Sequence, residues 1–445
     1  MMHRLIALAG VIALAQPTAE FTPAPRYPTP PPVSYDVTAL KKDPAPDVTY
    51  TQDKSCVEGR VNGDVNVKPW GQMGLNLEGA RRFGRGEGQL VAVIDTGVNR
   101  HPRLAGRLTS GGDYVQSGKD GTTDCDGHGT MVAGIIAADD ADRESAFEGV
   151  APGANILAIR QSSKAFGAQK NGVPARAGDQ STLAQAIVRA ADSKAKVINI
   201  SSVVCMAPGE NWPLVQAAVR YARKQNSVIV AAAGNVTSGK NSNCGNPNRP
   251  DSILTVPTPA WLDEDVLTVG ALNEDGAPAN FTLGGPWVDV AAPGTNNISL
   301  DPKEGASGLA NRYVDGNELH GVDGTSFAAP YVSGVVALVR ARYPHLDATQ
   351  VMERIKRTAR QPLGRSARDF HIGYGMVDPV AALTAVLPEE QGINPQPPLR
   401  STVDIAAPPP VDNRPLTVAL VGSGIALGLL ALTHLAVRAR RRRAT

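Results

Sequence analysis

The sequence predicts an α/β protein built on one largely parallel β-sheet with helices on both faces. Short apolar runs of strand length alternate with longer helical patterns along most of the 445 residues, which is typical of parallel strands connected by helices. With 42% hydrophobic residues, the chain can bury one large core, so we expect one main domain. The predicted strands are Gln89–Ile94, Asn155–Arg160, Lys196–Ser201, Val228–Ala233, Val266–Ala271 and Asp289–Ala292, and the predicted helices are Thr182–Lys194, Trp212–Gln225, Phe327–Arg342 and Ala348–Ala359.

The first predicted strand ends at a carboxylate. Gln89–Ile94 is a mostly apolar run, as expected of a buried parallel strand, and Asp95 follows it directly. Open α/β sheets place their sites at the carboxyl ends of the strands. We therefore expect Asp95 to lie in a crevice at that edge of the sheet.

A histidine and a serine each stand at the start of a predicted helix. His128 precedes a small-residue segment that runs from Met131 to Ala138, and Ser326 precedes Phe327–Arg342. The amino end of a helix carries partial positive charge, which favours an oxyanion beside a nucleophile. This arrangement predicts that Ser326 and part of its oxyanion site are built together.

Asp95, His128 and Ser326 are the residue types of a hydrolytic triad: a carboxylate, an imidazole base and a hydroxyl nucleophile. Asn235, in the Gly234-Asn235 pair after Val228–Ala233, could donate its amide N–H beside the Ser326 backbone N–H to form an oxyanion hole. Taken singly, each of these residues is more often a cap, a turn or a satisfied core group. Their occurrence together in the order Asp, His, Ser is what indicates catalysis.

These residues lie in four short motifs, Val93–Gly97, Asp126–Thr130, Ala232–Asn235 and Gly324–Pro330. The motifs resemble those of the subtilisin (subtilase, peptidase family S8) superfamily, over roughly residues 75 to 385. The two ends of the chain, together with Trp287–Pro293, are similar to those of the mycosins, the membrane-anchored subtilases of actinobacterial type VII secretion systems. The resemblance implies a subtilisin-like three-layer domain and a serine endopeptidase that cleaves exported proteins. Triad chemistry needs no cofactor, and acidic clusters such as Asp139–Asp142 lack the spacing of a calcium-binding loop, so we expect neither a cofactor nor a metal. The alternative is an interaction protein that stabilises the secretion membrane complex, with proteolysis secondary.

The two ends of the chain predict export and anchoring. A basic start, an apolar stretch and small residues before a cleavage point are typical of a secretory signal, although the stretch could remain as an uncleaved anchor. Near the other end, a span followed by arginines predicts a membrane helix with a cytoplasmic tail and an extracytoplasmic (periplasmic) catalytic domain. The formal net charge of +2 gives no electrostatic case for nucleic acid. The predicted parts are a signal peptide (1–19), a proline-rich extension (20–74), the peptidase domain (75–387), a proline-rich linker (388–415), a transmembrane helix (416–437) and a basic tail (438–445).

The extension at 20–74 lacks a clear strand-helix pattern, and we predict that it is retained rather than removed as a prodomain. The resemblance implies that it wraps the catalytic domain. Three insertions, 162–181, 237–259 and 296–320, are predicted as long loops that shape a substrate cleft or a docking surface.

Four cysteines on the exported side suggest two disulfides, for which three connectivities exist. Cys205 and Cys244 follow the consecutive strands Lys196–Ser201 and Val228–Ala233, which should be neighbours, so a Cys205–Cys244 bond is favoured and leaves Cys56–Cys125. Free buried cysteines are the remaining alternative, and the spacings do not resemble a zinc site.

Subtilases commonly have small residues after the third strand, where they line the primary specificity pocket. In this sequence Ser201-Ser202 runs into Val203. A β-branched side chain would narrow the pocket, which suggests a small residue before the cleaved bond.

Overall fold

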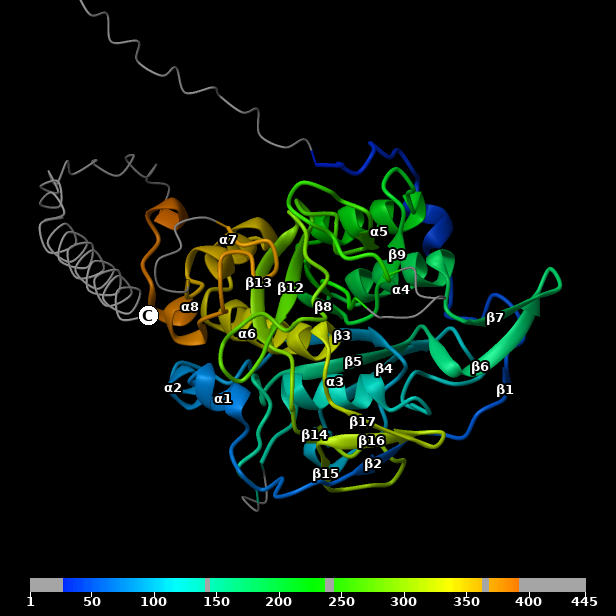
Figure 1. Cartoon of the computed structure of the whole chain (residues 1–445), viewed down its shortest axis with the longest axis horizontal. Coiled ribbons are helices and arrows are strands. Elements are labelled where there is room, and N and C mark those ends of the chain that lie inside the picture. The colour runs from blue at the N-terminus through cyan, green and yellow to red at the C-terminus, as the bar shows by residue number, and fades with distance from the viewer. Residues whose placement is uncertain (1–26, 141–144, 237–243, 362–367, 392–445) are drawn as a thin grey trace, which may run out of the picture. The chain divides into compact units, whose positions relative to one another are not determined.

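A computed structural model describes residues 27–140, 145–236, 244–361 and 368–391 (Figure 1). Its centre is a seven-stranded sheet in the order β13-β12-β10-β8-β3-β5-β4, in which every neighbouring pair is parallel. The strands of this sheet are β3 (Leu90–Asp95), β4 (Leu108–Asp113), β5 (Asn155–Arg160), β8 (Val197–Ile200), β10 (Val228–Ala232), β12 (Val266–Leu272) and β13 (Val288–Pro293).

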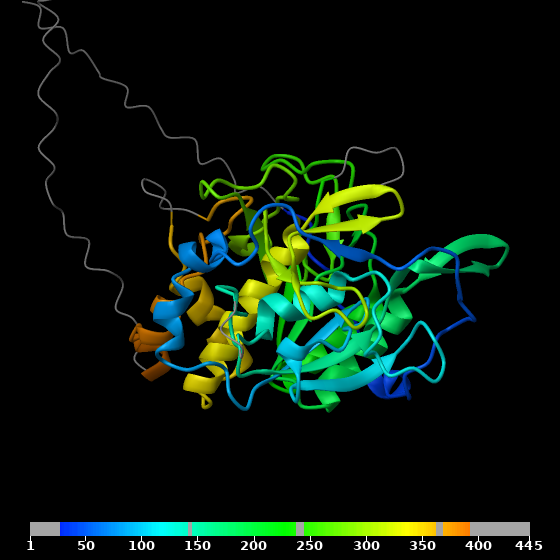
Figure 2. The same cartoon turned by 90° about the horizontal axis from the view of Figure 1, so that it is seen from below.

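Helices cover both faces of this sheet, which gives three layers (Figures 1 and 2). Alternate residues of β3 enter different cores: Val91 and Val93 pack on one side, Ala92 and Ile94 on the other. The first core includes α3 (His128–Ala137) and α6 (Thr325–Arg342), and the second includes α4 (Gln180–Asp192) and α5 (Pro213–Lys224). The predicted parallel-sheet architecture is therefore confirmed, with element ends shifted by only a few residues.

One strand of the central sheet was not predicted. β4, with the sequence Leu-Thr-Ser-Gly-Gly-Asp, is too rich in glycine and polar residues for its strand pattern to stand out. It forms at the sheet edge by pairing with β5. Tertiary pairing thus overrides weak local propensity at this position.

Two insertions predicted as loops fold into paired β-strands, so the loop assignment was wrong for them, although residues of both line the cavity described below. The insertion at 162–181 holds β6 (Ser163–Lys170) and β7 (Val173–Ala177), which project from the domain (Figure 1). The insertion at 296–320 contains short strands throughout. These are β14 (Ser299–Leu300), β15 (Leu309–Ala310), β16 (Arg312–Asp315) and the start of β17 (Glu318–Gly321), and the insertion at 237–259 holds β11 (Val256–Thr258), which pairs with β9 (Val204–Met206).

The amino-terminal extension is also more ordered than its sequence pattern suggested. Its strand β1 (Thr51–Gln52) adds to β6, and β2 (Glu58–Arg60) adds to β16. Strands of two or three residues carry no recognisable periodicity, so they depend on the hairpin edges that they pair with. The extension also contains the 3-10 helix η1 (Val37–Leu40) and the helix α1 (Trp70–Gly74).

The remaining helices include one, at residues 388–391, that lies in the predicted linker. This segment packs on the folded domain, because Glu390 accepts a hydrogen bond of 2.6 Å from Nε of the buried Arg354. The folded domain thus extends beyond residue 387. These helices are α2 (Leu77–Arg81), η2 (Pro102–Leu104), α7 (Ala348–Arg357), α8 (Pro379–Thr384) and η3 (Pro388–Gln391).

Within the described residues, none of the helices has the length and apolar character needed to cross a bilayer. The predicted signal peptide, the predicted transmembrane segment at 416–437 and the basic tail lie outside the described residues, as does the predicted linker beyond residue 391.

Candidate active site

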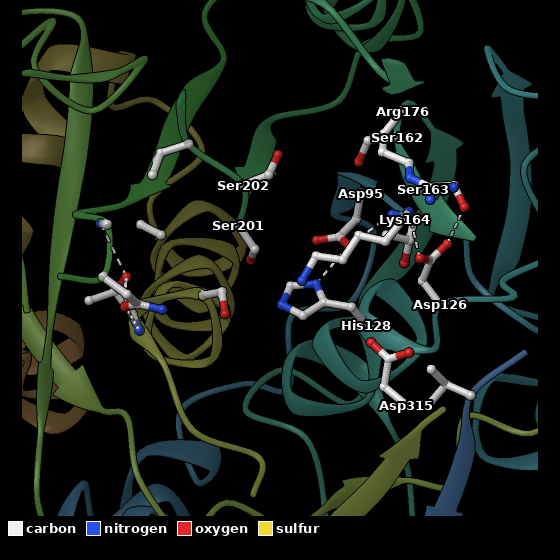
Figure 3. A pocket seen from close by; sticks show the side chains of 18 of the residues that line it. Asp95, Asp126, His128, Ser162, Ser163, Lys164, Arg176, Ser201, Ser202 and Asp315 are labelled. Atoms are coloured by element: carbon white, nitrogen blue, oxygen red, sulfur yellow. Dashed lines mark hydrogen bonds and ion pairs between the residues drawn. The ribbon is translucent and has the colours of Figure 1, made fainter. Parts of the chain in front are cut away.

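The predicted catalytic residues meet at one cavity of about 440 Å³. Asp95 ends β3, His128 and Ser326 lie in the first turns of α3 and α6, and Asn235 follows β10. All four line this cavity, part of which is drawn in Figure 3. Residues far apart in the chain are thus collected at the edge of the sheet where the carboxyl ends of its central strands lie, which is where α/β sheets build their sites.

Asp95 and His128 are directly hydrogen-bonded. His128 Nδ1 lies 2.7 Å from Asp95 Oδ1, and the carboxylate is only 2% exposed. Two glycines permit this approach: a Cβ at Gly129 would lie 2.1 Å from the carbonyl oxygen of Gly97, and Gly97 itself has φ of +106°. The glycines beside the aspartate and the histidine therefore let the start of α3 meet the end of β3.

The environment of His128 sets its proton affinity. Burial opposes the charged imidazolium, but the charge and the hydrogen bond of Asp95 outweigh it and raise the pKa of His128 above its ordinary value of 6.5. The ring also packs on Phe327, the residue after Ser326, at a centroid distance of 4.9 Å. This contact fixes the imidazole between Asp95 and the start of α6.

A second carboxylate, Asp124, is hydrogen-bonded to the segments that carry Asp95 and His128. It accepts hydrogen bonds from Gly127 N (2.7 Å) and Thr130 N (2.8 Å) at the start of α3, and from Thr96 Oγ1 (2.8 Å) beside Asp95. Burial raises the pKa of Asp124 to about 6, although these donors favour its charged form. Asp124 and Thr96 thus connect the strand that carries Asp95 to the helix that carries His128.

Ser326 is the second residue of α6, and Gly324, the residue just before this helix, has an unusual backbone conformation. Gly324 has φ of +145°, and a Cβ there would lie 3.0 Å from Ser326 Oγ and 3.1 Å from Asn235 Nδ2. The hydroxyl and the amide therefore approach the same small space. Within the described part of the chain, no hydrogen bond joins Ser326 Oγ to His128, and such contacts often shorten only when substrate is bound.

Thr325 determines which way the Asn235 side chain points. Asn235 Oδ1 accepts from Thr325 N (3.0 Å) and from Thr325 Oγ1 (2.8 Å), while that hydroxyl accepts from Gly234 N (3.1 Å). With its oxygen held by these donors, the side chain directs its NH₂ group to the other side, near Ser326 Oγ. The amide is therefore oriented as a hydrogen-bond donor toward the cavity.

Another part of the cavity wall is formed by Ser201, Ser202 and Val203, which follow strand β8. A Cβ at Gly234 would lie 3.2 Å from Val203 Cγ2, so the valine closely approaches the glycine that precedes Asn235. The adjacent disulfide joins Cys205 to Cys244, and Cys244 itself lines the cavity. This part of the cavity wall is braced by a disulfide.

The second disulfide, Cys56–Cys125, ties the extension to the loop before His128. Val57 follows it, donates its N–H to Cys125 O at 2.8 Å and lines the cavity. Because β1 pairs with β6 and β2 pairs with β16, the extension connects the two hairpins that flank this region (Figure 1). The extension is therefore part of the cavity wall.

Sequence reasoning missed Thr96, Asp124, Thr325 and Lys164. Thr96 and Thr325 stand inside the recognised motifs but act through hydrogen bonds that spacing alone does not reveal.

Within the described ranges, no three histidine, cysteine, aspartate or glutamate side chains gather in a way that could hold a metal ion.

Comparison with known proteins gives consistent matches. Residues 86–375 match the model of the subtilase family, Peptidase_S8. Mycosin-3 of Mycobacterium tuberculosis (strain ATCC 25618 / H37Rv) is 43% identical over 426 residues, which cover 90% of each chain. The structure of MycP3 protease from the type VII (ESX-3) secretion system is 41% identical, with a TM-score of 0.69 over 80% of this chain and 97% of that chain. A chain in the structure of an intact ESX-5 inner membrane complex is 40% identical, with a TM-score of 0.74 over 92% of this chain and 99% of that chain.

Proposed function

Because this chain belongs to the subtilase family of serine proteases, and within it to the mycosins, we propose that it hydrolyses peptide bonds with Ser326 as nucleophile, His128 as base and Asp95 as the group that orients His128. The observation that carries the proposal is the 2.7 Å Asp95–His128 hydrogen bond, in a cavity that Ser326 and Asn235 also line.

In the proposed reaction, His128 removes the proton of Ser326 Oγ as the oxygen attacks the substrate carbonyl carbon. The negative charge that develops on the carbonyl oxygen is stabilised by Asn235 Nδ2 and by the Ser326 N–H at the start of α6. His128 then gives its proton to the leaving amine. Water repeats the attack on the acyl-enzyme with His128 again as base, which regenerates Ser326.

Asn235→Ala should lower kcat by about 100- to 1,000-fold with little change in KM, because the lost donor acts mainly on the transition state. Asn235→Asp is the informative partner variant. It keeps the side-chain shape and an oxygen for Thr325 but removes the N–H donor, so we expect a loss at least as large. Wild-type turnover in Asn235→Asp would contradict the role of the amide.

Activity should fall as pH decreases through the pKa of His128, because only the neutral imidazole can accept the Ser326 proton. Since Asp95 raises that pKa above 6.5, half-maximal kcat/KM is expected above this value rather than below it. The measurement is kcat/KM for an uncharged peptide from pH 5 to 9. A rate that stays constant down to pH 5 would be incompatible with this role.

The close approach of Val203 to Gly234 in the cavity wall supports a preference for a small side chain before the cleaved bond. The proposed substrates are exported proteins. To test the proposed activity, the full-length protein is incubated with a mixed peptide library, and mass spectrometry identifies the bonds that it cuts. Absence of any Ser326-dependent cleavage would contradict it.

The proposed location is the cell membrane. The apolar segment 416–437 and the arginines after it support a single span, with the catalytic domain on the extracytoplasmic (periplasmic) side and the basic tail in the cytoplasm. Residues 1–19 would be a removed signal peptide, 20–74 a retained extension and 388–415 a linker whose first residues belong to the folded domain. Retention in membranes after alkaline extraction, compared with a chain truncated after residue 391, tests the anchor.

A second function is favoured by one observation. A chain similar to this one over 92% of its length occurs in the structure of an ESX-5 inner membrane complex. We therefore also propose that this protein associates with a type VII secretion membrane complex and stabilises it. A Ser326→Ala chain that still restores assembly of the complex in a deletion strain would separate this function from proteolysis.

A further inference from the structure

We propose that Lys164 selects substrates that carry an aspartate or glutamate close to the cleaved bond. This inference rests on the proposed proteolytic function and specifies its substrate class. Lys164 is the second residue of β6 and lines the same cavity as Asp95 and His128. In Figure 3 its side chain extends across the cavity wall so that its terminal nitrogen lies beside the imidazole of His128.

The backbone at Lys164 is held firmly. Asp126, two residues before His128, accepts hydrogen bonds from Lys164 N (2.7 Å) and Ala165 N (3.2 Å) through Oδ1, and its other oxygen accepts from the Ser163 hydroxyl. Strand β1 pairs with β6 two residues further on, where Gln52 faces Phe166. Lys164 thus projects from a strand whose backbone is fixed to Asp126, two residues before His128, so the base of its side chain is held beside the cavity.

The Lys164 ammonium has no counter-ion among the described residues. Two carboxylates that line the same cavity are already committed, Asp126 to backbone N–H groups and Asp95 to His128. Other lysines nearby are paired, as Lys170 is with Asp179 at 3.1 Å. An unpaired cation on the wall of a substrate cavity is available to a substrate carboxylate.

The surrounding charges support this reading. Burial and then Asp95 have the largest effects on the pKa of His128. The positive charge of Lys164 also acts to lower that pKa, which indicates an electrostatic interaction between Lys164 and His128. Arg176 on the same wall is bound to Asp53, whereas Asp315 lies on the other side of His128 in Figure 3. A substrate carboxylate near Lys164 would therefore meet one free positive charge. Lys164 is exposed, so the ion pair would contribute the modest amount that is typical of a pair in contact with water.

The test uses the full-length protein and peptides that differ only at one position within three residues of the cleaved bond, where they carry glutamate, glutamine or lysine. We expect the wild type to prefer glutamate over glutamine in kcat/KM by about two- to fivefold at one of these positions. Lys164→Met should reduce that ratio to about one, and Lys164→Glu should make lysine the preferred residue. Because each ratio is taken within one protein sample, a loss of correctly folded protein does not change it.

Two controls separate the possible causes. Lys224→Met removes an exposed lysine from α5, away from the cavity, and should leave the wild-type ratio unchanged. Added salt should weaken the glutamate preference, because screening reduces an ion-pair contribution. A wild-type ratio near one, or a ratio preserved in Lys164→Met, would overturn the role of Lys164 while leaving the proteolytic function intact. Failure of the wild type to cut any peptide would instead overturn the proposed function and this inference with it.

Discussion

Replacing Ser326 by alanine is expected to lower peptidase turnover by about a million-fold while the protein remains folded. The hydroxyl is the proposed nucleophile, and it lies at the start of α6 near the amide nitrogen of Asn235. Within the described residues, no hydrogen bond of the Ser326 hydroxyl supports the fold, so its removal should have little effect on thermal unfolding. The measurement is kcat for a cleaved peptide together with the melting temperature.

Ser333→Ala is a matched control in the same helix. Ser333 is completely buried, and its hydroxyl donates to Asn199 Oδ1 at 2.8 Å. Its removal should destabilise the protein by about 1–3 kcal/mol, because Asn199 loses a buried partner, and should leave turnover nearly unchanged. If Ser326→Ala retained substantial activity, the proposed nucleophile would be wrong.

Asp95→Asn should lower kcat by about 10⁴-fold at neutral pH. The carboxylate accepts from His128 Nδ1 at 2.7 Å and from Thr96 N at 2.8 Å. An amide can turn its NH₂ group toward the ring, which would stabilise the tautomer with its proton on Nε2. That tautomer cannot accept the Ser326 proton.

The same substitution should also change the pH dependence of the remaining activity. Asp95 is the group that raises the pKa of His128 against the effect of burial, so its neutralisation should move the acid limb of kcat/KM to lower pH. Asp192→Asn, which removes a surface carboxylate on α4, should change neither the rate nor the limb. A large loss of rate in Asp95→Asn with an unshifted limb would argue for general destabilisation instead.

The parallel sheet could be predicted because its strands are continuous apolar runs that need both faces buried, as Ile94 and Val230 illustrate. Gly-rich β4 and the two-residue β1 could not, because they exist only through pairing with a neighbouring strand. The same reason explains the two hairpins that were expected to be loops. The local hydrophobic pattern identifies strands and helices whose own apolar residues enter the core. Edge strands and short added strands depend instead on pairing with segments that are distant in the sequence.

The four candidate site residues were recognisable because each lies in a short contiguous motif at a strand end or a helix start. The supporting residues were not. Asp124 bonds to Thr96, 28 positions earlier, and Thr325 bonds to Asn235, 90 positions earlier. Lys164 lies in no motif, and only the folded chain shows that it lines the same cavity as His128. Such roles depend on three-dimensional proximity, which spacing in one sequence does not encode.

The proposed catalytic centre can be tested most directly by labelling the full-length protein with diisopropyl fluorophosphate. A serine activated by His128 should attack phosphorus and expel fluoride, which leaves one diisopropylphosphoryl group. Peptide mass spectrometry at pH 8 should place this group on Ser326 alone, with no adduct in Ser326→Ala and much slower labelling in His128→Ala. An adduct on another residue, or equally fast labelling of Ser326 without His128, would contradict the Asp95–His128–Ser326 assignment.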